Sequence, residues 1–163
     1  SWATRLLFWA SLFPFVACAA WEFYKQHLRS QNGNAKSAAE KEKKIQSYIA
    51  RRRAEADSLT AVLATGVEPR QAAQRAKGGL VILSAKYGVR GAPPEEVADV
   101  TIAVAALVDD EGRLVIPRGT RKSKLLGWWD PAPGRRKVLR VKYLYRGKEG
   151  TVEVEGRDGV RLP

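Results

Sequence analysis

The chain has 163 residues, enough for one modest domain with appendages, and its 29 Lys and Arg against 17 Asp and Glu give a formal net charge of +12. A single cysteine, Cys18, excludes a disulfide within the chain, and a single histidine, His27, excludes a metal site built from a His and Cys cluster. The positive charge favours an anionic lipid surface or nucleic acid, without choosing between them.

The most apolar stretch lies at the start of the sequence. No charged residue occurs from Leu6 to Trp21, and only Arg5 interrupts the apolar character back to Trp2. A helix needs about 20 residues to cross a bilayer core of roughly 30 Å, so this length is just sufficient. Pro14 is expected to kink the helix. The sequence therefore predicts a membrane helix over residues 1–24. Its expected anchor side chains are Leu6, Leu7, Phe8, Trp9, Phe13, Phe15 and Trp21.

Two other interpretations of this stretch stay open. One is a helix buried in a protein core, because the strictly apolar run is shorter than a typical membrane span. The other is a cleaved signal peptide, which also combines a basic start, a short apolar run and small residues such as those around Cys18. The sequence begins with Ser and contains no Met, which is typical of a piece of a longer chain and argues against a signal peptide.

A polar exit segment over residues 25–34 and a helical linker over residues 35–77 are expected next. The exit segment ends in QNGN, which is typical of a break. A helix face with one Arg in it then recurs at alternating spacings of four and three, as in the contact face of a coiled coil. Its residues are Ile45, Ile49, Arg52, Ala56, Leu59 and Leu63. The pattern predicts either a contact with a partner or a helix packed on its own domain. The candidate partner-binding residues on this face are Ile45, Ile49, Leu59 and Leu63. A break near residues 65–68 is expected at Thr65-Gly66, followed by a second short helix.

From Gly79 onward the pattern changes to the period of two that is typical of strands. The predicted strands cover residues 80–87, 97–108, 113–116, 138–145, 151–155 and 160–162, with 113–116 returning as a hairpin on 97–108. The expected fold class is mixed: a transmembrane helix, a long amphipathic linker helix, and a small all-β antiparallel, sandwich-like head over residues 78–163.

No enzyme signature is found in the sequence. A single histidine beside the predicted membrane segment cannot complete a Ser/His/Asp or Cys/His arrangement. No Gly-rich phosphate loop of the known spacings follows a predicted strand. We therefore expect a protein that is not an enzyme and that has no cofactor and no metal.

The segment LLGWWDPAPG, residues 125–134, is the most unusual part of the head. In an extended segment adjacent side chains face opposite ways, so Trp128 is predicted in the core and Trp129 toward a partner. Asp130 is expected either to cap loop amides or to bind that partner. Basic residues flank the segment and predict a patch for lipid headgroups or an acidic partner. These residues are Arg118, Arg121, Lys122, Lys124, Arg135, Arg136 and Lys137.

An ordered set of motifs resembles the C-terminal domain of the family of DnaJ homologue, subfamily C, member eleven. The motifs are GGLVILSAKYG, EVADVTIAVAALVDDEGRLVIPRG, KSKLLGWWDPAPG, VLRVKYLYRG and the terminal VRLP, and they cover about half the chain. Trp128-Trp129 replaces the family's aromatic residue and its neighbour, and Ala132 stands where Cys is common. His27 is followed by Leu28, so the His-Pro-Asp signature of a J domain does not occur here.

The resemblance implies an organelle envelope protein, because relatives associate with the mitochondrial outer membrane and the cristae-organising contact sites. The expected location is a mitochondrial membrane, with the outer membrane or a contact site favoured and a plastid envelope as the alternative. The expected role is a non-catalytic scaffold whose partners are the bilayer and other membrane-protein subunits of a complex. The alternative is the C-terminal part of a co-chaperone, which would recruit an Hsp70 only through a J domain upstream of residue 1. Nucleic acid is not expected as a partner.

Overall fold

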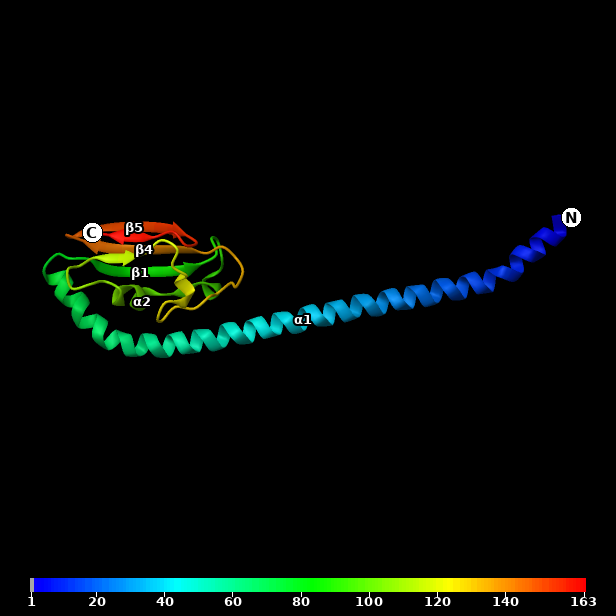
Figure 1. Cartoon of the computed structure of the whole chain (residues 1–163), viewed down its shortest axis with the longest axis horizontal. Helices are drawn as coiled ribbons and strands as arrows, with labels where there is room; N and C mark the ends of the chain where they lie inside the picture. Colours follow the sequence, from blue (N-terminus) through cyan, green and yellow to red (C-terminus); the bar gives the residue numbers. More distant parts are fainter. Residues whose placement is uncertain (1) are drawn as a thin grey trace. The chain divides into compact units, whose positions relative to one another are not determined.

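The computed structural model describes residues 2–163, which fall into two compact units that meet between Ile45 and Gln46. One helix, α1 (Trp2–Ala76), contributes to both units (Figure 1). The second unit also contains every strand and the short helices that follow α1. This unit therefore begins inside a helix rather than at residue 78, where the change in sequence pattern occurs.

The first unit is helical at every described residue. The breaks expected at the polar segment are absent, because α1 continues through Gln31–Asn34. A Cβ at Gly33 would touch no other atom, and a glycine in an exposed helix costs only about 1 kcal/mol relative to alanine. Figure 1 shows α1 changing direction within its dark blue first part, which contains Pro14. Proline has no backbone N–H, so one hydrogen bond of the helix is missing there. Among residues 2–45 no side chain is buried.

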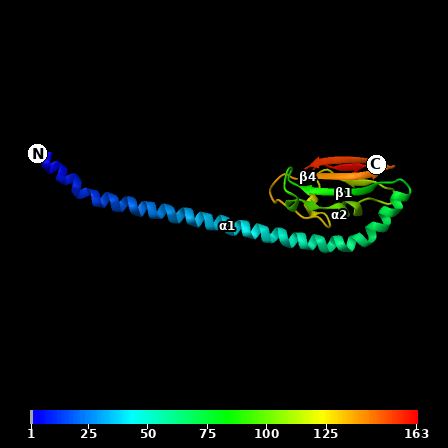
Figure 2. The same ribbon diagram turned by 180° about the vertical axis from the view of Figure 1, so that it is seen from behind.

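The helix end expected at Thr65-Gly66 is also wrong, because α1 continues to Ala76. Val67 is only 3% exposed and belongs to the hydrophobic core, so packing offsets the unfavourable helix propensities of Gly66 and Pro69. Figure 1 and Figure 2 show this last part of α1 curving around the strands. A proline within a helix is a usual cause of such bending.

Polar side chains tie the last turns of α1 to the strands and loops beside them. The side-chain oxygen of Gln71 accepts a hydrogen bond from the amide of Ile82 at 2.8 Å. The guanidinium of Arg70 donates to the carbonyl of Val108 at 2.6 Å, and the buried Gln74 side chain donates to the carbonyl of Asp110 at 3.0 Å. These contacts, together with the buried Ala56 and Val67, place residues 46–76 of α1 within the fold of the head rather than in a free linker.

The strands form two antiparallel sheets. The larger has the order β2-β1-β4-β5, and the smaller pairs β3 with β6. The strands are β1 (Val81–Gly88), β2 (Ala98–Asp99), β3 (Leu114–Ile116), β4 (Val138–Tyr145), β5 (Lys148–Glu155) and β6 (Val160–Leu162). The predicted hairpin involving 113–116 is wrong, because Leu114 lies opposite Leu162 near the end of the chain. In β4 the predicted alternation is confirmed, with Leu139 and Val141 buried and Arg140 exposed.

The strand predicted over residues 97–108 is mostly a helix. Only β2 is extended there, and α2 covers Thr101–Ala106. The carboxylate of Asp99 accepts hydrogen bonds from the amide of Thr101, the first residue of α2, at 3.1 Å and from its hydroxyl at 2.6 Å, while the N-cap residue Val100 makes no side-chain cap. Val100, Ala103 and Val104 are each at most 2% exposed, and their spacing of three and four places them on one buried helix face.

The head is therefore mixed rather than all-β. Two short 3-10 helices, η1 (Pro94–Glu96) and η2 (Lys122–Lys124), complete it. In both views α2 lies on the side of β1 that faces α1 (Figure 1, Figure 2). One hydrophobic core joins buried residues of both helices, both sheets and the Trp128-Trp129 loop.

The Asp99 carboxylate gives the head a testable dependence on acid. Burial favours a higher pKa for Asp99, but hydrogen bonds from Lys86, at 2.8 Å, and from Thr101 outweigh it and lower the pKa below its usual value. An unfolded Asp ionises near pH 3.9, so this contribution to stability is present above about pH 4 and is lost as the pH falls through the lower folded pKa. Asp99→Asn keeps an oxygen that can accept the bonds from Thr101 and is expected to make the free energy of unfolding depend less on pH below about pH 4.

Urea unfolding at a series of pH values measures this effect. Asp57→Asn is a control, because Asp57 is exposed on α1. An acid dependence that is the same in the wild type and in Asp99→Asn would contradict this role of Asp99.

Candidate membrane and partner-binding surfaces

The predicted anchor residues form an uncovered apolar surface on the first part of α1. Leu6, Leu7, Phe8, Trp9, Phe13, Phe15 and Trp21 are each 53–74% exposed. By length and composition alone, α1 includes one stretch able to cross a membrane, near its N-terminus, and none of that stretch is buried. Large exposed apolar patches are uncommon on soluble monomers and mark surfaces that bind a membrane or a protein.

The four candidate partner-binding residues on the linker helix do not share one environment. Ile49 is partly buried and packs against the core, and Leu63 is also partly buried. Ala56, on the same face, is 2% exposed. Of the two predicted alternatives, a partner contact or packing on its own domain, the second therefore applies to α1 around Ile49 and Ala56. Ile45 and Leu59 are 42% and 41% exposed and stay available for a partner.

Both tryptophans of the LLGWWDPAPG segment are buried. Trp128 is 1% exposed, as predicted, and its ring contacts the Tyr87 ring edge-on with centroids 5.3 Å apart. The outward position predicted for Trp129 is wrong, because this residue is 5% exposed and its ring lies 5.3 Å from the guanidinium carbon of Arg53 on α1. The segment is not extended here: Gly127 has a φ of 84°, and the amide of Trp128 donates to the carbonyl of Leu125 at 3.1 Å. Strand alternation therefore does not apply.

Asp130 stabilises its own loop. Its Oδ1 accepts a hydrogen bond from the amide of Ala132 at 3.0 Å, as the capping interpretation predicts. The same oxygen lies 3.1 Å from the ammonium of Lys137. A carboxylate engaged twice within the head is poorly placed to be the main contact with a partner.

The predicted basic patch divides into buried and exposed residues. Lys122 and Lys137 are 2% and 8% exposed. The Lys122 ammonium donates to the carbonyls of Gly156 and Asp158, both at 2.7 Å, and burial lowers its pKa although Asp158 opposes the shift. The Lys137 ammonium donates to the carbonyls of Ala132 at 3.0 Å and Arg135 at 2.6 Å. The remaining predicted members, Arg118, Arg121, Lys124, Arg135 and Arg136, are exposed.

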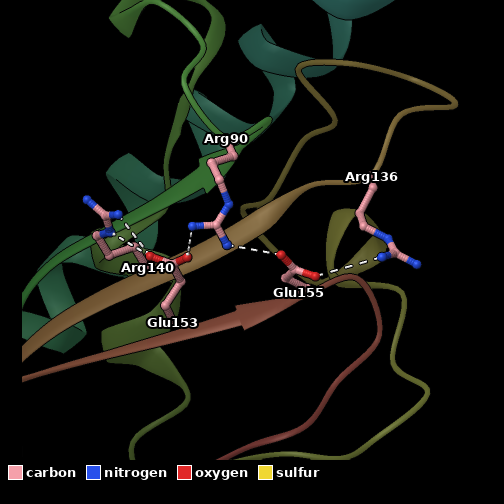
Figure 3. A network of polar contacts seen from close by, with 5 residues as sticks. All are labelled: Arg90, Arg136, Arg140, Glu153 and Glu155. Carbon is pink, nitrogen blue, oxygen red and sulfur yellow. Dashed lines mark hydrogen bonds and ion pairs between the residues drawn. The ribbon is translucent and has the colours of Figure 1, made fainter.

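A charged network on the β4-β5 surface was not predicted from the sequence (Figure 3). Glu153 lies opposite Arg140 in the strand register and accepts its hydrogen bond at 2.8 Å, and Arg90 also pairs with Glu153. The carboxylate of Glu155 lies 3.0 Å from the guanidinium of Arg90 and 3.8 Å from that of Arg136. The hydrogen bond from Arg140 and the charge of Arg90 hold the pKa of Glu153 below its usual value. Exposed pairs of this kind contribute little to stability, so the network is a surface feature of the head.

No described group of three or more His, Cys, Asp or Glu side chains is arranged to hold a metal ion. The single histidine, His27, lies on the exposed surface of α1 with its Nε2 3.0 Å from the side chain of Gln31.

Comparisons with known proteins agree with the resemblance seen in the motifs. Residues 40–163 match the family described as DnaJ-like protein C11, C-terminal. The DnaJ homolog subfamily C member 11 of Pongo abelii is 28% identical over 165 residues, which cover 96% of this chain and 29% of that protein. Its Dictyostelium discoideum homolog is 34% identical over 128 residues, covering 72% of this chain and 22% of the relative. An uncharacterized J domain-containing protein of Schizosaccharomyces pombe is 28% identical over 160 residues, covering 96% of this chain and 26% of the relative. No solved structure matches.

These matches define the class first: the chain is related to J proteins, and it spans about a quarter of the length of the curated relatives. It belongs to the family of DnaJ-like protein C11 C-terminal domains. The resemblance predicted from the motifs is thereby confirmed.

Proposed function

We propose that this chain is a non-catalytic, membrane-anchored structural subunit of an organellar envelope complex and that it mediates contacts between proteins. The observation that carries the proposal is the exposed apolar surface on the first part of α1, with side chains such as Phe13 and Phe15 each 74% exposed. Exposure of such a surface to water is unfavourable, whereas its contact with lipid or with other membrane helices is favourable. The same helix continues into the packed head, so anchor and head are covalently one element.

A mitochondrial membrane is the proposed location, with the outer membrane or a contact site favoured and a plastid envelope as the alternative. The family relationship supports this location, because the resemblance implies that relatives associate with the mitochondrial outer membrane and with contact sites. The proposed partners are the bilayer and other membrane-protein subunits. Ile45 and Leu59, which remain exposed on α1, are the proposed protein contacts.

Deleting residues 1–24 tests the anchor. The truncated protein is expected to move into the soluble fraction on alkaline carbonate extraction, because the remaining sequence contains no other apolar run long enough to span a bilayer. A matched control replaces residues 1–24 by an unrelated membrane helix of equal length, which should restore resistance to extraction. Resistance of the truncated protein itself would show that this segment is not the sole anchor.

A second candidate function is that of the C-terminal part of a J-domain co-chaperone. The names of the relatives favour it, since they are J-domain or DnaJ proteins that extend well beyond the region matched here. The transcript sequence upstream of residue 1 tests it, because a helical hairpin carrying His-Pro-Asp would supply the Hsp70-recruiting module. Affinity purification of the natural protein in mild detergent then separates the two functions: the scaffold recovers integral membrane subunits, and the co-chaperone recovers an Hsp70.

A further inference from the structure

We propose that a cavity on the basic side of the head binds a multiply charged phosphate compound. The cavity has a volume of about 440 Å³ and lies between η2, the loop of residues 130–137 and the turn at Gly156-Arg157. Tyr87, at the end of β1, also lines it. These segments are far apart in the sequence and are brought together only by the fold.

The charge of the cavity walls is strongly positive and largely unneutralised. Arg121, Lys124, Arg135 and Arg157 line the cavity and are exposed, and among the described residues their side chains have neither an ion pair nor a hydrogen bond. Among the described residues, Asp130 is the sole acidic residue that lines the cavity. Its Oδ1 lies 3.1 Å from the ammonium of Lys137. Guanidinium groups bind phosphate and carboxylate oxygens in a bidentate manner, and several unpaired cations around one cavity favour a ligand that carries several negative charges, such as a phosphate compound.

Tyr87 adds a hydroxyl to the cavity lining, and the residue as a whole is 5% exposed. Among the described residues, the buried side-chain polar atom without a hydrogen-bond partner is the Nε1 of Trp128, whose ring packs against Tyr87. A tyrosine hydroxyl is protonated at neutral pH and can donate a hydrogen bond, and burial, assisted by the charge of Asp130, raises the pKa of Tyr87 further, to about 12. Because the Tyr87 ring is held edge-on against Trp128, the donor is fixed in place before a ligand arrives.

The two buried lysines hold the walls rather than bind the ligand. Lys122 connects η2 to the Gly156 turn through hydrogen bonds of 2.7 Å. On the opposite wall, the ammonium of Lys137 donates hydrogen bonds to the carbonyls of Ala132 and Arg135 within its own loop. Walls fixed in this way lower the entropy that is lost when an anion binds. Arg136 also lines the cavity, and its guanidinium lies 3.8 Å from the carboxylate of Glu155 (Figure 3).

The size of the cavity selects among phosphate compounds. Small-molecule sites usually have volumes of about 300–1,000 Å³, and a cavity near 440 Å³ lies in this range. A single inorganic phosphate would occupy only a small part of it and would leave most of the four free cations unpaired. The geometry therefore fits a diphosphate or an organic phosphate, whether as a soluble metabolite or as a lipid headgroup.

Titration calorimetry on the full chain in an uncharged detergent tests the proposal, with pyrophosphate and inositol hexakisphosphate as probes at near-physiological salt. We expect saturable binding at one site. Arg121→Glu combined with Arg135→Glu should weaken it by about tenfold or more, since two charge-assisted contacts with the ligand are lost and two negative charges are added. Tyr87→Phe, which removes only the hydroxyl, should weaken it by about threefold or more.

Arg118→Glu is the matched control, because Arg118 is exposed and basic but does not line the cavity. Its effect should stay below about twofold at this salt concentration. Equal weakening by Arg118→Glu and by the cavity variants, or no saturable binding of either probe, would overturn the proposal. Thermal melts verify that each variant is folded, and Arg135→Gln replaces the double variant if that protein does not fold.

Nanodiscs distinguish the two sources of phosphate. Pyrophosphate is titrated into the protein in discs of phosphatidylcholine alone and in discs that also contain phosphatidic acid. Weaker apparent affinity in the acidic discs, lost in the cavity variants, supports a lipid headgroup as the ligand. Unchanged affinity supports a soluble phosphate. Either result is independent of the anchor, which alkaline extraction tests separately.

Discussion

Trp128→Ala is expected to lower the free energy of unfolding of the head by about 3–5 kcal/mol, the usual cost of truncating a large buried side chain. Trp128 is 1% exposed and packs against Tyr87, so the substitution leaves a cavity that the surrounding side chains cannot easily fill. Since a typical domain is stable by only about 5–15 kcal/mol, the loss approaches global unfolding. Thermal melts of the full chain in detergent, monitored by near-ultraviolet circular dichroism, measure it.

Trp129→Ala is expected to have an effect of the same order, because Trp129 is also buried. The matched control is Leu126→Ala in the same loop, where the side chain is 61% exposed and the loss should be below about 1 kcal/mol. A melting temperature unchanged by Trp129→Ala would contradict the buried position and would restore the interpretation of Trp129 as a partner contact.

Ala56→Asp is expected to lower the free energy of unfolding by about 3–5 kcal/mol, because it places an unpaired carboxylate in an apolar contact. Ala56 lies where α1 packs on the core and is 2% exposed. The aspartate has poor access to water there, so folding must either bury its charge or separate this part of α1 from the head. Urea unfolding of the full chain in detergent measures the loss.

Ala54→Asp provides the matched control, since it introduces the same side chain two residues away at an exposed position of α1. It should change stability by less than about 0.5 kcal/mol. Equal losses for the two variants would show that residues 46–76 of α1 are not an integral part of the head fold.

Several strands could be predicted because their signal is local. In β4 the residues alternate between buried and exposed, and the predicted bounds are those of the structure. The turn that follows, Arg146-Gly147, has positive φ values of 50° and 75°, which suits a tight hairpin between β4 and β5. By contrast, α2 has apolar residues at spacings that fit both a strand and a helix, so periodicity alone could not separate them. The burial of Val100, Ala103 and Val104 on one helix face favours the helix in the folded protein.

The candidate surfaces were predicted with uneven success for a similar reason. Composition identifies the apolar stretch of α1 and the basic residues around the LLGWWDPAPG segment, because charge and hydrophobicity belong to single residues. Composition cannot show that Lys122 and Lys137 are buried, since this depends on carbonyl groups that the fold places beside them. The cavity is hidden from the sequence for the same reason, because its walls come from four separate segments.

The sequence by itself determined the family, the apolar N-terminal stretch, and the strands whose side chains alternate, since each of these is written in local order and spacing. Only the tertiary structure decided that α1 continues past Gly66, that β3 pairs with β6, and that Trp129 is buried. The physical reason is that local propensities differ by only about 1 kcal/mol per residue, whereas burial of a large apolar side chain contributes about 1.5–3 kcal/mol. Where the two conflict, contacts between residues distant in sequence determine the outcome.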